Sequence, residues 1–193
     1  FDVKFPGTEV QERTVFDAWG NAIEAVGLDG ARTLAWHDSL NRVVAQVDAL
    51  GYLTEVDYDR SGNAIQKRVY ETALDLASLS HSAKPVAPGG KMHKTDYVYD
   101  SANRLIEERS PQVSVMNQDS HAVSNESVIT RYRYDQSGNP VQKTVAAGTG
   151  LQQTEYSYYD NRNQRIASVD GNRVLTLFGY DNASRVTSTV RFA

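Results

Sequence analysis

A short phrase recurs along this chain and limits what it can fold into. The stretch YDRSGNAIQKRV begins at Tyr58, and nearly the same stretch, YDQSGNPVQKTV, begins at Tyr134. Both contain an Asp that follows a ring-bearing side chain and precedes a Gly, Asn or Ser by three residues, and this pattern occurs seven times. The anchor aspartates are Asp17, Asp38, Asp59, Asp100, Asp135, Asp160 and Asp181. Three of the intervals are 21 residues and the others are longer, which predicts a tandem repeat with inserted segments.

Each repeat carries the signature of a tight turn between two strands. The third residue after the anchor is Gly20, Asn41, Gly62, Asn103, Gly138, Asn163 or Ser184. Gly and Asn best tolerate a positive φ, so we expect a left-handed turn residue here. The Asp before it can accept hydrogen bonds from the backbone N–H groups just ahead. Thr and aromatic residues lie on the approach and Ile or Val on the exit, which together predict a β-hairpin.

A second turn must follow within each 21-residue unit. Suitable residues lie at Leu28–Ala31, Asp48–Tyr52 and Asp170–Asn172. The unit is then two strands of about seven residues, close to the usual strand length. The sequence therefore predicts an all-β fold, in which tandem hairpins form an antiparallel ribbon that must curl or pack to bury apolar surface.

The fourth residue after the anchor alternates in type. It reads Asn21, Arg42, Asn63, Arg104, Asn139, Gln164, Arg185, so Gly–Asn and Asn–Arg turns alternate through six repeats, with Gln164 and Ser184 as imperfect members. The true unit is then a pair of hairpins of about 42 residues, or two 21-residue intervals. We expect the Arg to reach along a neighbouring strand and the Asn to stay local to its own turn.

Composition excludes several classes of protein. Hydrophobic residues make up 40% and charged residues 23% of the chain, which is typical of a folded protein. The net charge is −4 with both signs interspersed, whereas nucleic-acid binding usually requires a basic patch. No apolar run approaches the roughly 20 residues of a membrane helix. The lack of cysteine excludes disulfides, cysteine-ligated zinc and thiol catalysis within the chain.

The anchor aspartates invite a chemical interpretation, because paired carboxylates can act as acid and base and Asp-rich turns can bind Ca²⁺. Each anchor, however, occupies the same place in its own hairpin, and the spacing matches neither an EF-hand nor a nonapeptide calcium repeat. We therefore interpret them as structural turn residues. No phosphate loop or dinucleotide motif is present, and the sequence predicts no cofactor, no metal site and no catalytic residue.

The histidines and tyrosines are likewise interpreted as structural residues and not as a binding or catalytic site. His37 takes the aromatic position before an anchor, which predicts a packing role, and His81, His93 and His121 share no metal-ligand spacing. The Tyr column suits either sugar stacking or a ladder within the sheet. Five of the 11 Tyr precede anchors, which favours the ladder.

The columns Thr-x-x-x-Tyr-Asp-x-x-Gly/Asn-Asn/Arg-x-Ile/Val resemble the YD repeat of the RHS-repeat family. The resemblance extends from about Gln11 to Arg191. The family includes bacterial Rhs proteins, the B and C components of insecticidal toxin complexes, wall-associated polymorphic toxins and animal teneurins. The resemblance implies a long β-ribbon that spirals into a hollow shell. In the toxins the shell encloses a C-terminal toxic domain. A plug segment closes the shell, and many members release the domain by aspartic self-cleavage.

One part of the family pattern is missing. The chain ends TSTVRFA, still within the repeats, and contains no DPxG or NPYxY-like segment of the kind that marks the plug and cleavage site. Neither self-cleavage nor toxic activity can be transferred to a residue here. The chain begins at Phe1 with no Met and no signal peptide, so we expect a segment of a longer protein.

The repeats imply one array over residues 1–193, interrupted by inserts at about 70–93, 110–128 and 146–152. We expect a short helix in the first insert, with Ala73, Leu74 and Ala77 on one face, and a mobile loop or lengthened strands in the second. The third is a small Gly-containing loop. We interpret the inserts as surface excursions, with contact to neighbouring shell or cargo as the alternative.

Two functions from different classes remain. The first is a non-catalytic segment of a shell that encapsulates a toxic C-terminal domain, with the remaining repeats and that domain as partners. The second is an adhesive or carbohydrate-binding module at the cell surface, with glycans as partners. Both imply a secreted or bacterial cell-surface location. A glycosidase is the least favoured, because it requires two non-equivalent carboxylates across one cleft.

Overall fold

The structure, a computed structural model, describes residues 12–116 and 123–192. These residues form fourteen β-strands and one short 3-10 helix. The chain divides into two compact units, Phe1–Lys94 and Thr95–Ala193. The elements are β1 (Arg13–Phe16), β2 (Ala22–Val26), β3 (Arg32–His37), β4 (Val43–Val47), β5 (Tyr52–Tyr58), β6 (Ala64–Ala73), η1 (Leu76–Ser78), β7 (Met92–Tyr99), β8 (Leu105–Met116), β9 (Val123–Tyr134), β10 (Pro140–Val145), β11 (Gln153–Tyr159), β12 (Arg165–Val169), β13 (Leu175–Tyr180) and β14 (Val186–Phe192).

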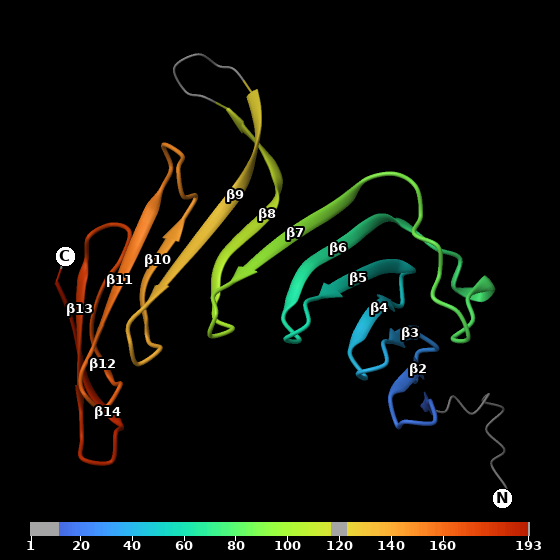
Figure 1. Cartoon of the computed structure of the whole chain (residues 1–193), viewed down its shortest axis with the longest axis horizontal. Coiled ribbons are helices and arrows are strands. Elements are labelled where there is room, and N and C mark those ends of the chain that lie inside the picture. The colour runs from blue at the N-terminus through green and yellow to red at the C-terminus, as the bar shows by residue number, and fades with distance from the viewer. Residues whose placement is uncertain (1–11, 117–122, 193) are drawn as a thin grey trace, which may run out of the picture. The chain divides into compact units, whose positions relative to one another are not determined.

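Both units are antiparallel meanders. In the first unit β1 to β6 pair in the order of the sequence, and β7 to β14 do the same, with β7 crossing the division between the units (Figure 1). The predicted all-β array of antiparallel hairpins is therefore confirmed. Strands run from 4 to 12 residues, so the expected length of about seven is only a mean.

The hairpins turn at the seven anchors. We call each five-residue turn, from the anchor Asp to the fourth residue after it, an anchor tip. Tips 1 to 7 are residues 17–21, 38–42, 59–63, 100–104, 135–139, 160–164 and 181–185. The opposite ends of the hairpins use the same turn at residues 27–31, 48–52 and 170–174. In the last of these the positive-φ residue is Arg173 and not Gly171, because the turn keeps the three-residue spacing from Asp170.

The structure of the three inserts agrees only in part with the loops, lengthened strands and short helix predicted from the sequence. Residues 110–128 do lengthen β8 and β9, while residues 117–122, with His121, lie outside the described residues. Residues 146–152 form a turn closed by hydrogen bonds from Thr149 to Ala146 and from Gln152 to Thr149. In the first insert the predicted helix is wrong at Ala73, which still belongs to β6; the only helical turn there is η1.

A small core lies on one face of the first unit. Residues alternate between buried and accessible along β3, β4 and β5, as expected where one face of a sheet is covered. Leu34, Val47 and Leu53 face one another across adjacent strands and are almost fully buried. Trp36, Ala45 and Tyr70 complete the cluster.

The cover of this core comes from the first insert. We call residues 74–84 the strap. Its Leu74, Leu76 and Leu79 pack against the cluster. The interpretation of this insert as a plain surface excursion is therefore wrong for the strap, because without these leucines the apolar face of β3 to β5 would meet water.

The core predicts a sharp difference between two leucines of the same unit. Leu53→Ala is expected to lower the free energy of unfolding by about 2–5 kcal/mol, because a side chain with 0% exposure leaves a cavity. The matched control Leu40→Ala, at a position 66% exposed, should change it by less than about 0.5 kcal/mol. Urea denaturation followed by circular dichroism measures both. Equal losses would contradict this assignment of the core.

Candidate functional site

The anchor tips repeat one hydrogen-bonding pattern. In tip 1 the Asp17 N–H donates to the Asn21 carbonyl (2.9 Å), and the Gly20 N–H donates to the Asp17 carbonyl (3.2 Å). Asp17 Oδ1 accepts from the N–H groups of Trp19 and Asn21, both at 2.9 Å. This is a type I turn followed by a left-handed residue. At all seven tips the anchor Oδ1 accepts the N–H of the fourth residue.

The predicted positive φ at the third residue is confirmed at every tip. The values are 85° at Gly20, 61° at Asn41, 91° at Gly62, 58° at Asn103, 88° at Gly138, 60° at Asn163 and 63° at Ser184. Ser184 is neither Gly nor Asn, so its backbone carries strain of about 1–2 kcal/mol. The turn geometry is therefore set by the position in the repeat and tolerates a residue type that does not favour it.

The second carboxylate oxygen of the anchor binds the side chain of the fourth residue. Asn21, Asn63 and Asn139 donate their amide to the anchor Oδ2 at 2.9 Å. Arg42, Arg104 and Arg185 donate Nε at 2.7–2.8 Å. Gln164 is the exception, because its amide nitrogen is buried without a hydrogen-bond partner.

The same side chains connect neighbouring tips. Arg42 Nη1 donates to the carbonyl of Asp59 in the next tip (3.2 Å), as Arg104 does to Asp135 (3.3 Å). The predicted reach of the Arg is therefore confirmed. The prediction that the Asn stays local is wrong: Asn21 Nδ2 also donates to Asn41 Oδ1 at 2.9 Å. A primary amide has two hydrogens, so one serves its own anchor and the other serves the neighbour.

This pairing accounts for the alternation of turn types. Asn139 donates to Asn163 at 2.8 Å, as Asn21 does to Asn41, so a Gly–Asn tip needs an Asn in the third position of the following tip. In an Asn–Arg tip the guanidinium instead donates to the backbone carbonyl of the anchor Asp in the following tip, so that carbonyl must be accessible. Gly62 is not required for space here, since a Cβ built on it would lie at an ordinary contact distance of 4.0 Å from Arg42 Nη1. The two tip types therefore complement each other in one direction along the sheet.

The aromatic column forms a second ladder beside the tips. The hydroxyls of four tyrosines donate to the carbonyl of the fifth residue after the preceding anchor. The pairs are Tyr58 with Val43 (3.0 Å), Tyr134 with Leu105 (2.8 Å), Tyr159 with Pro140 (3.4 Å) and Tyr180 with Arg165 (3.0 Å). The guanidinium carbons of Arg42 and Arg104 lie 4.5 and 4.8 Å from the ring centres of Tyr58 and Tyr134, which places them in cation–π contact.

His37 departs from this ladder. It stands in the aromatic column, but its Nδ1 is buried without a hydrogen-bond partner. The ring is half-buried at the end of β3. Its position in the column is compatible with packing, and it lacks the carbonyl contact that a tyrosine makes there.

At six tips the hydrogen bonds favour the ionised form of the anchor carboxylate. The pKa of Asp59 lies below its usual value, chiefly because the Asn63 side chain donates to it. The pKa values of Asp17, Asp38, Asp100, Asp135 and Asp181 are lowered in the same way by hydrogen bonds from the residue four positions on. An ionised, hydrogen-bonded carboxylate is a poor proton donor at neutral pH. Its contribution to stability is present above the unfolded pKa of about 3.9 and is lost as the pH falls through the lower folded value.

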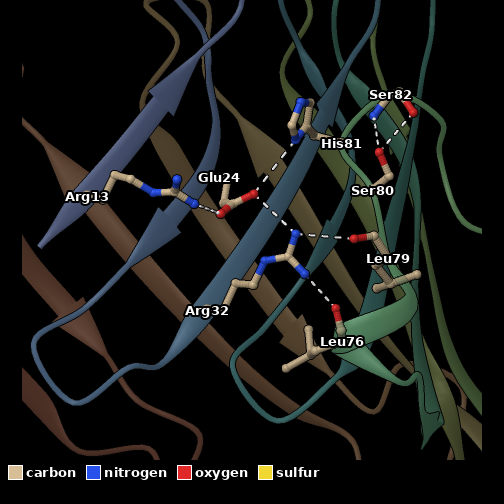
Figure 2. Close-up of polar contacts among 8 residues, drawn as sticks. All are labelled: Arg13, Glu24, Arg32, Leu76, Leu79, Ser80, His81 and Ser82. Carbon is tan, nitrogen blue, oxygen red and sulfur yellow. Dashed lines mark hydrogen bonds and ion pairs between the residues drawn. The ribbon is translucent and has the colours of Figure 1, made fainter.

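A different polar cluster clamps the strap to the sheet (Figure 2). Glu24 on β2 is 6% exposed. It pairs with Arg13 (2.5 Å), with Arg32 (3.1 Å) and with Nδ1 of His81 in the strap (3.7 Å). Arg32 also donates to the strap carbonyls of Leu76 (2.5 Å) and Leu79 (3.2 Å).

Glu55 on β5 makes the second clamp and is 5% exposed. It accepts hydrogen bonds from Tyr70 Oη (2.7 Å), from Arg68 Nε (3.2 Å) and from Nζ of Lys84 at the end of the strap. Burial acts to raise the pKa of Glu55, but the three donors outweigh it and the pKa is lowered. The pKa of Glu24 is lowered first by the hydrogen bond from Arg32.

Sequence reasoning missed both clamps. Leu34 and Glu55 stand at the same repeat position, four residues before an anchor. Glu55 therefore places a carboxylate where the neighbouring repeat has a core leucine, and this substitution indicates a buried ion pair. Its partner in the strap, Lys84, lies 29 residues away in the sequence and belongs to no repeat column. The pattern alone therefore did not reveal the contact.

The described residues offer little for ligand chemistry. None of their His, Asp and Glu side chains form a group of three that could hold a metal ion. A depression of about 210 Å³ lies among Tyr132, Lys143, Glu155 and Tyr159, below the roughly 300–1,000 Å³ of most small-molecule sites. In the described part of the chain no helix has the length and apolar character to cross a membrane.

Comparisons with known proteins bear on the fold. No family profile and no curated protein matches the chain. The crystal structure of TcdB2-TccC3-TEV matches 91% of this chain with a TM-score of 0.61 and 12% sequence identity. The chain shares its fold with a segment of this complex. That segment is 8% of the matched chain, so this chain spans only a small part of the protein that it resembles.

Two further structures have lower scores. The Photorhabdus luminescens Tc holotoxin pore covers 83% of this chain and 9% of its own, with a TM-score of 0.43 and 16% identity. TcdB2-TccC3 without its hypervariable C-terminal region covers 93% of this chain and 11% of its own, with a TM-score of 0.38 and 17% identity. The statement on fold rests on the first structure alone.

The tip geometry predicts opposite results for two substitutions of one glycine. Gly62→Val is expected to lower the free energy of unfolding by about 1–2 kcal/mol, because a β-branched residue strains left-handed backbone. Gly62→Asn is expected to be nearly neutral, because Asn41 and Asn103 hold the same conformation in their own tips. Chemical denaturation measures the difference, and a Val variant as stable as the natural chain would contradict the turn assignment.

The unpaired amide of Gln164 predicts a stabilising substitution. Gln164→Arg is expected to raise the free energy of unfolding by about 1 kcal/mol, because the guanidinium can bind Asp160, the Asp181 carbonyl and the Tyr180 ring at once. Gln164→Lys is the matched control, since it adds the charge without a planar fork of donors. If Lys stabilises the chain as much as Arg in thermal denaturation, general charge and not the bridge is responsible.

Proposed function

We propose that this chain is a non-catalytic structural segment of a toxin-complex shell built from YD, or RHS, repeats. One combined observation carries the proposal: seven equivalent Asp turns lie in a fold that matches the TcdB2-TccC3-TEV structure over 91% of the chain. Within this proposal the Asp turn and the aromatic ladder are the three-dimensional form of the YD repeat. Their side chains serve turn geometry and contact between hairpins.

The distribution of buried residues supports a role inside a larger assembly. Among the described residues of the second unit, Ala147 is the one buried hydrophobic residue. Tyr158, Ala167, Leu177 and Val190 face one another across β11 to β14, yet Tyr158, Leu177 and Val190 stay exposed. A ribbon of hairpins gains its stability from neighbouring repeats, so such a unit needs further chain against it.

The carboxylates support the absence of catalysis. The anchors are ionised turn acceptors, and Glu24 and Glu55 are paired with cations on all sides. A retaining or inverting glycosidase needs one carboxyl group with a raised pKa facing another across a cleft. Within this proposal the partners are the remaining repeats and the toxic domain that the shell encloses, and the protein is secreted or held at the bacterial surface.

Electron cryomicroscopy of the complete natural protein tests the proposal. We expect residues 12–192 to form part of the wall of a closed β-shell, with one face turned to an enclosed cavity. A density map in which these residues form a separate lobe, with water on both faces of the sheet, would overturn it.

Activity and glycan assays of the chain itself separate the alternatives. We expect no turnover of glycan or peptide substrates and no saturable binding on a glycan array. Turnover that is lost when one anchor Asp is replaced would establish an enzyme. Saturable glycan binding that is lost on replacement of surface tyrosines would favour an adhesive module instead.

A further inference from the structure

The strap is attached to the sheet in a way that depends on charge. Three leucines cover the apolar cluster. At the start of the strap the Leu74 N–H donates to the Gly51 carbonyl, and further along Arg32 binds the carbonyls of Leu76 and Leu79. Towards its end His81 meets Glu24 and Lys84 meets Glu55. The strap itself has only one helical turn of three residues, capped by Asp75.

The groups around the two glutamates are cations or hydrogen-bond donors. Glu24 is faced by Arg13 from β1, Arg32 from β3 and His81 from the strap. Glu55 is faced by Arg68 and Tyr70 from β6 and by Lys84 from the strap. Arg68 is shared with Asp57, an exposed carboxylate on the same strand as Glu55. The strap's own carboxylate, Asp75, caps its helical turn, so Glu24 and Glu55 are the sheet carboxylates that bind the strap.

We propose that the strap is an acid-released latch: protonation of Glu24 and Glu55 detaches residues 74–84 from the sheet and uncovers the cluster that contains Trp36 and Leu53. Once the glutamates are neutral, Arg13, Arg32 and Arg68 of the sheet and Lys84 of the strap lose the carboxylates that bind them. The attraction is then lost, and the like charges of Arg68 and Lys84, which both bind Glu55, repel each other. This inference does not depend on the shell assignment.

The sign of the pH dependence follows from the glutamates. The pKa values of Glu24 and Glu55 are both lowered in the folded chain. Their contribution to holding the strap is therefore complete above the unfolded value of about 4.3, and it is lost as the pH falls through the lower folded values. The latch is closed at neutral pH and opens in acid.

The strap should open before the sheet unfolds. The strands β3 to β5 are held by continuous backbone pairing. Among the described residues the strap has one backbone hydrogen bond to the sheet, from the Leu74 N–H to the Gly51 carbonyl, and is otherwise held by side chains, including two carbonyl contacts with Arg32. Segments with few backbone hydrogen bonds and few buried contacts open at lower free energy than core strands. Opening is then a local two-state event and not global denaturation.

The chain provides its own optical probe. It has two tryptophans, of which Trp36 is 7% exposed in the cluster and Trp19 is 79% exposed in tip 1. Trp19→Phe therefore leaves a single reporter under the strap. Adding Glu24→Gln and Glu55→Gln imitates the protonated state at pH 7, where the anchor aspartates remain ionised.

At pH 7 we expect acrylamide quenching of Trp36 to increase at least about threefold in the Glu24→Gln/Glu55→Gln variant, with far-ultraviolet circular dichroism retained. Asp57→Asn is the matched control, because it removes the same charge from the same sheet without touching the strap. The control should leave Trp36 shielded. A folded double variant in which Trp36 stays shielded would overturn the proposal.

Hydrogen exchange of the natural chain at pH 2.5, well below the unfolded glutamate value of about 4.3, provides the second measurement. We expect residues 74–84 to exchange at least tenfold faster, relative to pH 7 and corrected for intrinsic rates, while β3 to β5 remain protected. If the strap and these strands lose protection together, or if the double variant loses its circular dichroism with its shielding, the strap is an inseparable part of the core and the latch is wrong.

Discussion

The turns of both meanders depend on the anchor Asp, whose backbone and two carboxylate oxygens each make a separate hydrogen-bonding contact. Its backbone closes the turn, its Oδ1 fixes the backbone of the fourth residue, and its Oδ2 fixes the side chain of that residue. A two-stranded hairpin is marginal in water by itself. In tips 1, 2, 4 and 5 the fourth residue also contacts the following tip, so these turns support their neighbours as well as themselves. Local rigidity and contact between repeats therefore come from the same atoms.

The two units differ in how much of the apolar surface of their sheet is buried. In the first, an insert folds back and its leucines seal the apolar face of β3 to β5. In the second, the equivalent sheet keeps its tyrosines and leucines largely accessible. A single layer of sheet cannot bury both faces, so whatever covers it decides how stable each part is. The buried glutamates of the first unit fit this view, since they are tolerated only where arginines and the strap enclose them.

The sequence predicted the repeated part of the structure well, because that part is local. The spacing from the anchor determines where φ turns positive, and the rule holds even for Ser184, which residue type alone would not indicate. The reach of Asn21 was missed because it depends on how close the next tip lies, which no single repeat contains. The strap was missed for the same reason: Arg32 and Leu76 are 44 residues apart and share no column. A contact between a repeat and an inserted segment occurs only once in the chain, so the periodicity of the sequence cannot reveal it.

The alternation of tips also restricts how such a chain can lengthen. A Gly–Asn tip donates an amide that only an Asn in the next tip accepts, and an Asn–Arg tip sends a guanidinium towards a carbonyl beside a glycine. Duplicating one hairpin would set two tips of the same type side by side, and one donor would face nothing. Duplicating a pair preserves every contact. Gene recombination that adds or removes repeats is then expected to leave an even number of hairpins between matching tips. The alternation fails at tip 7, where Arg185 follows the unpaired Gln164 amide of tip 6.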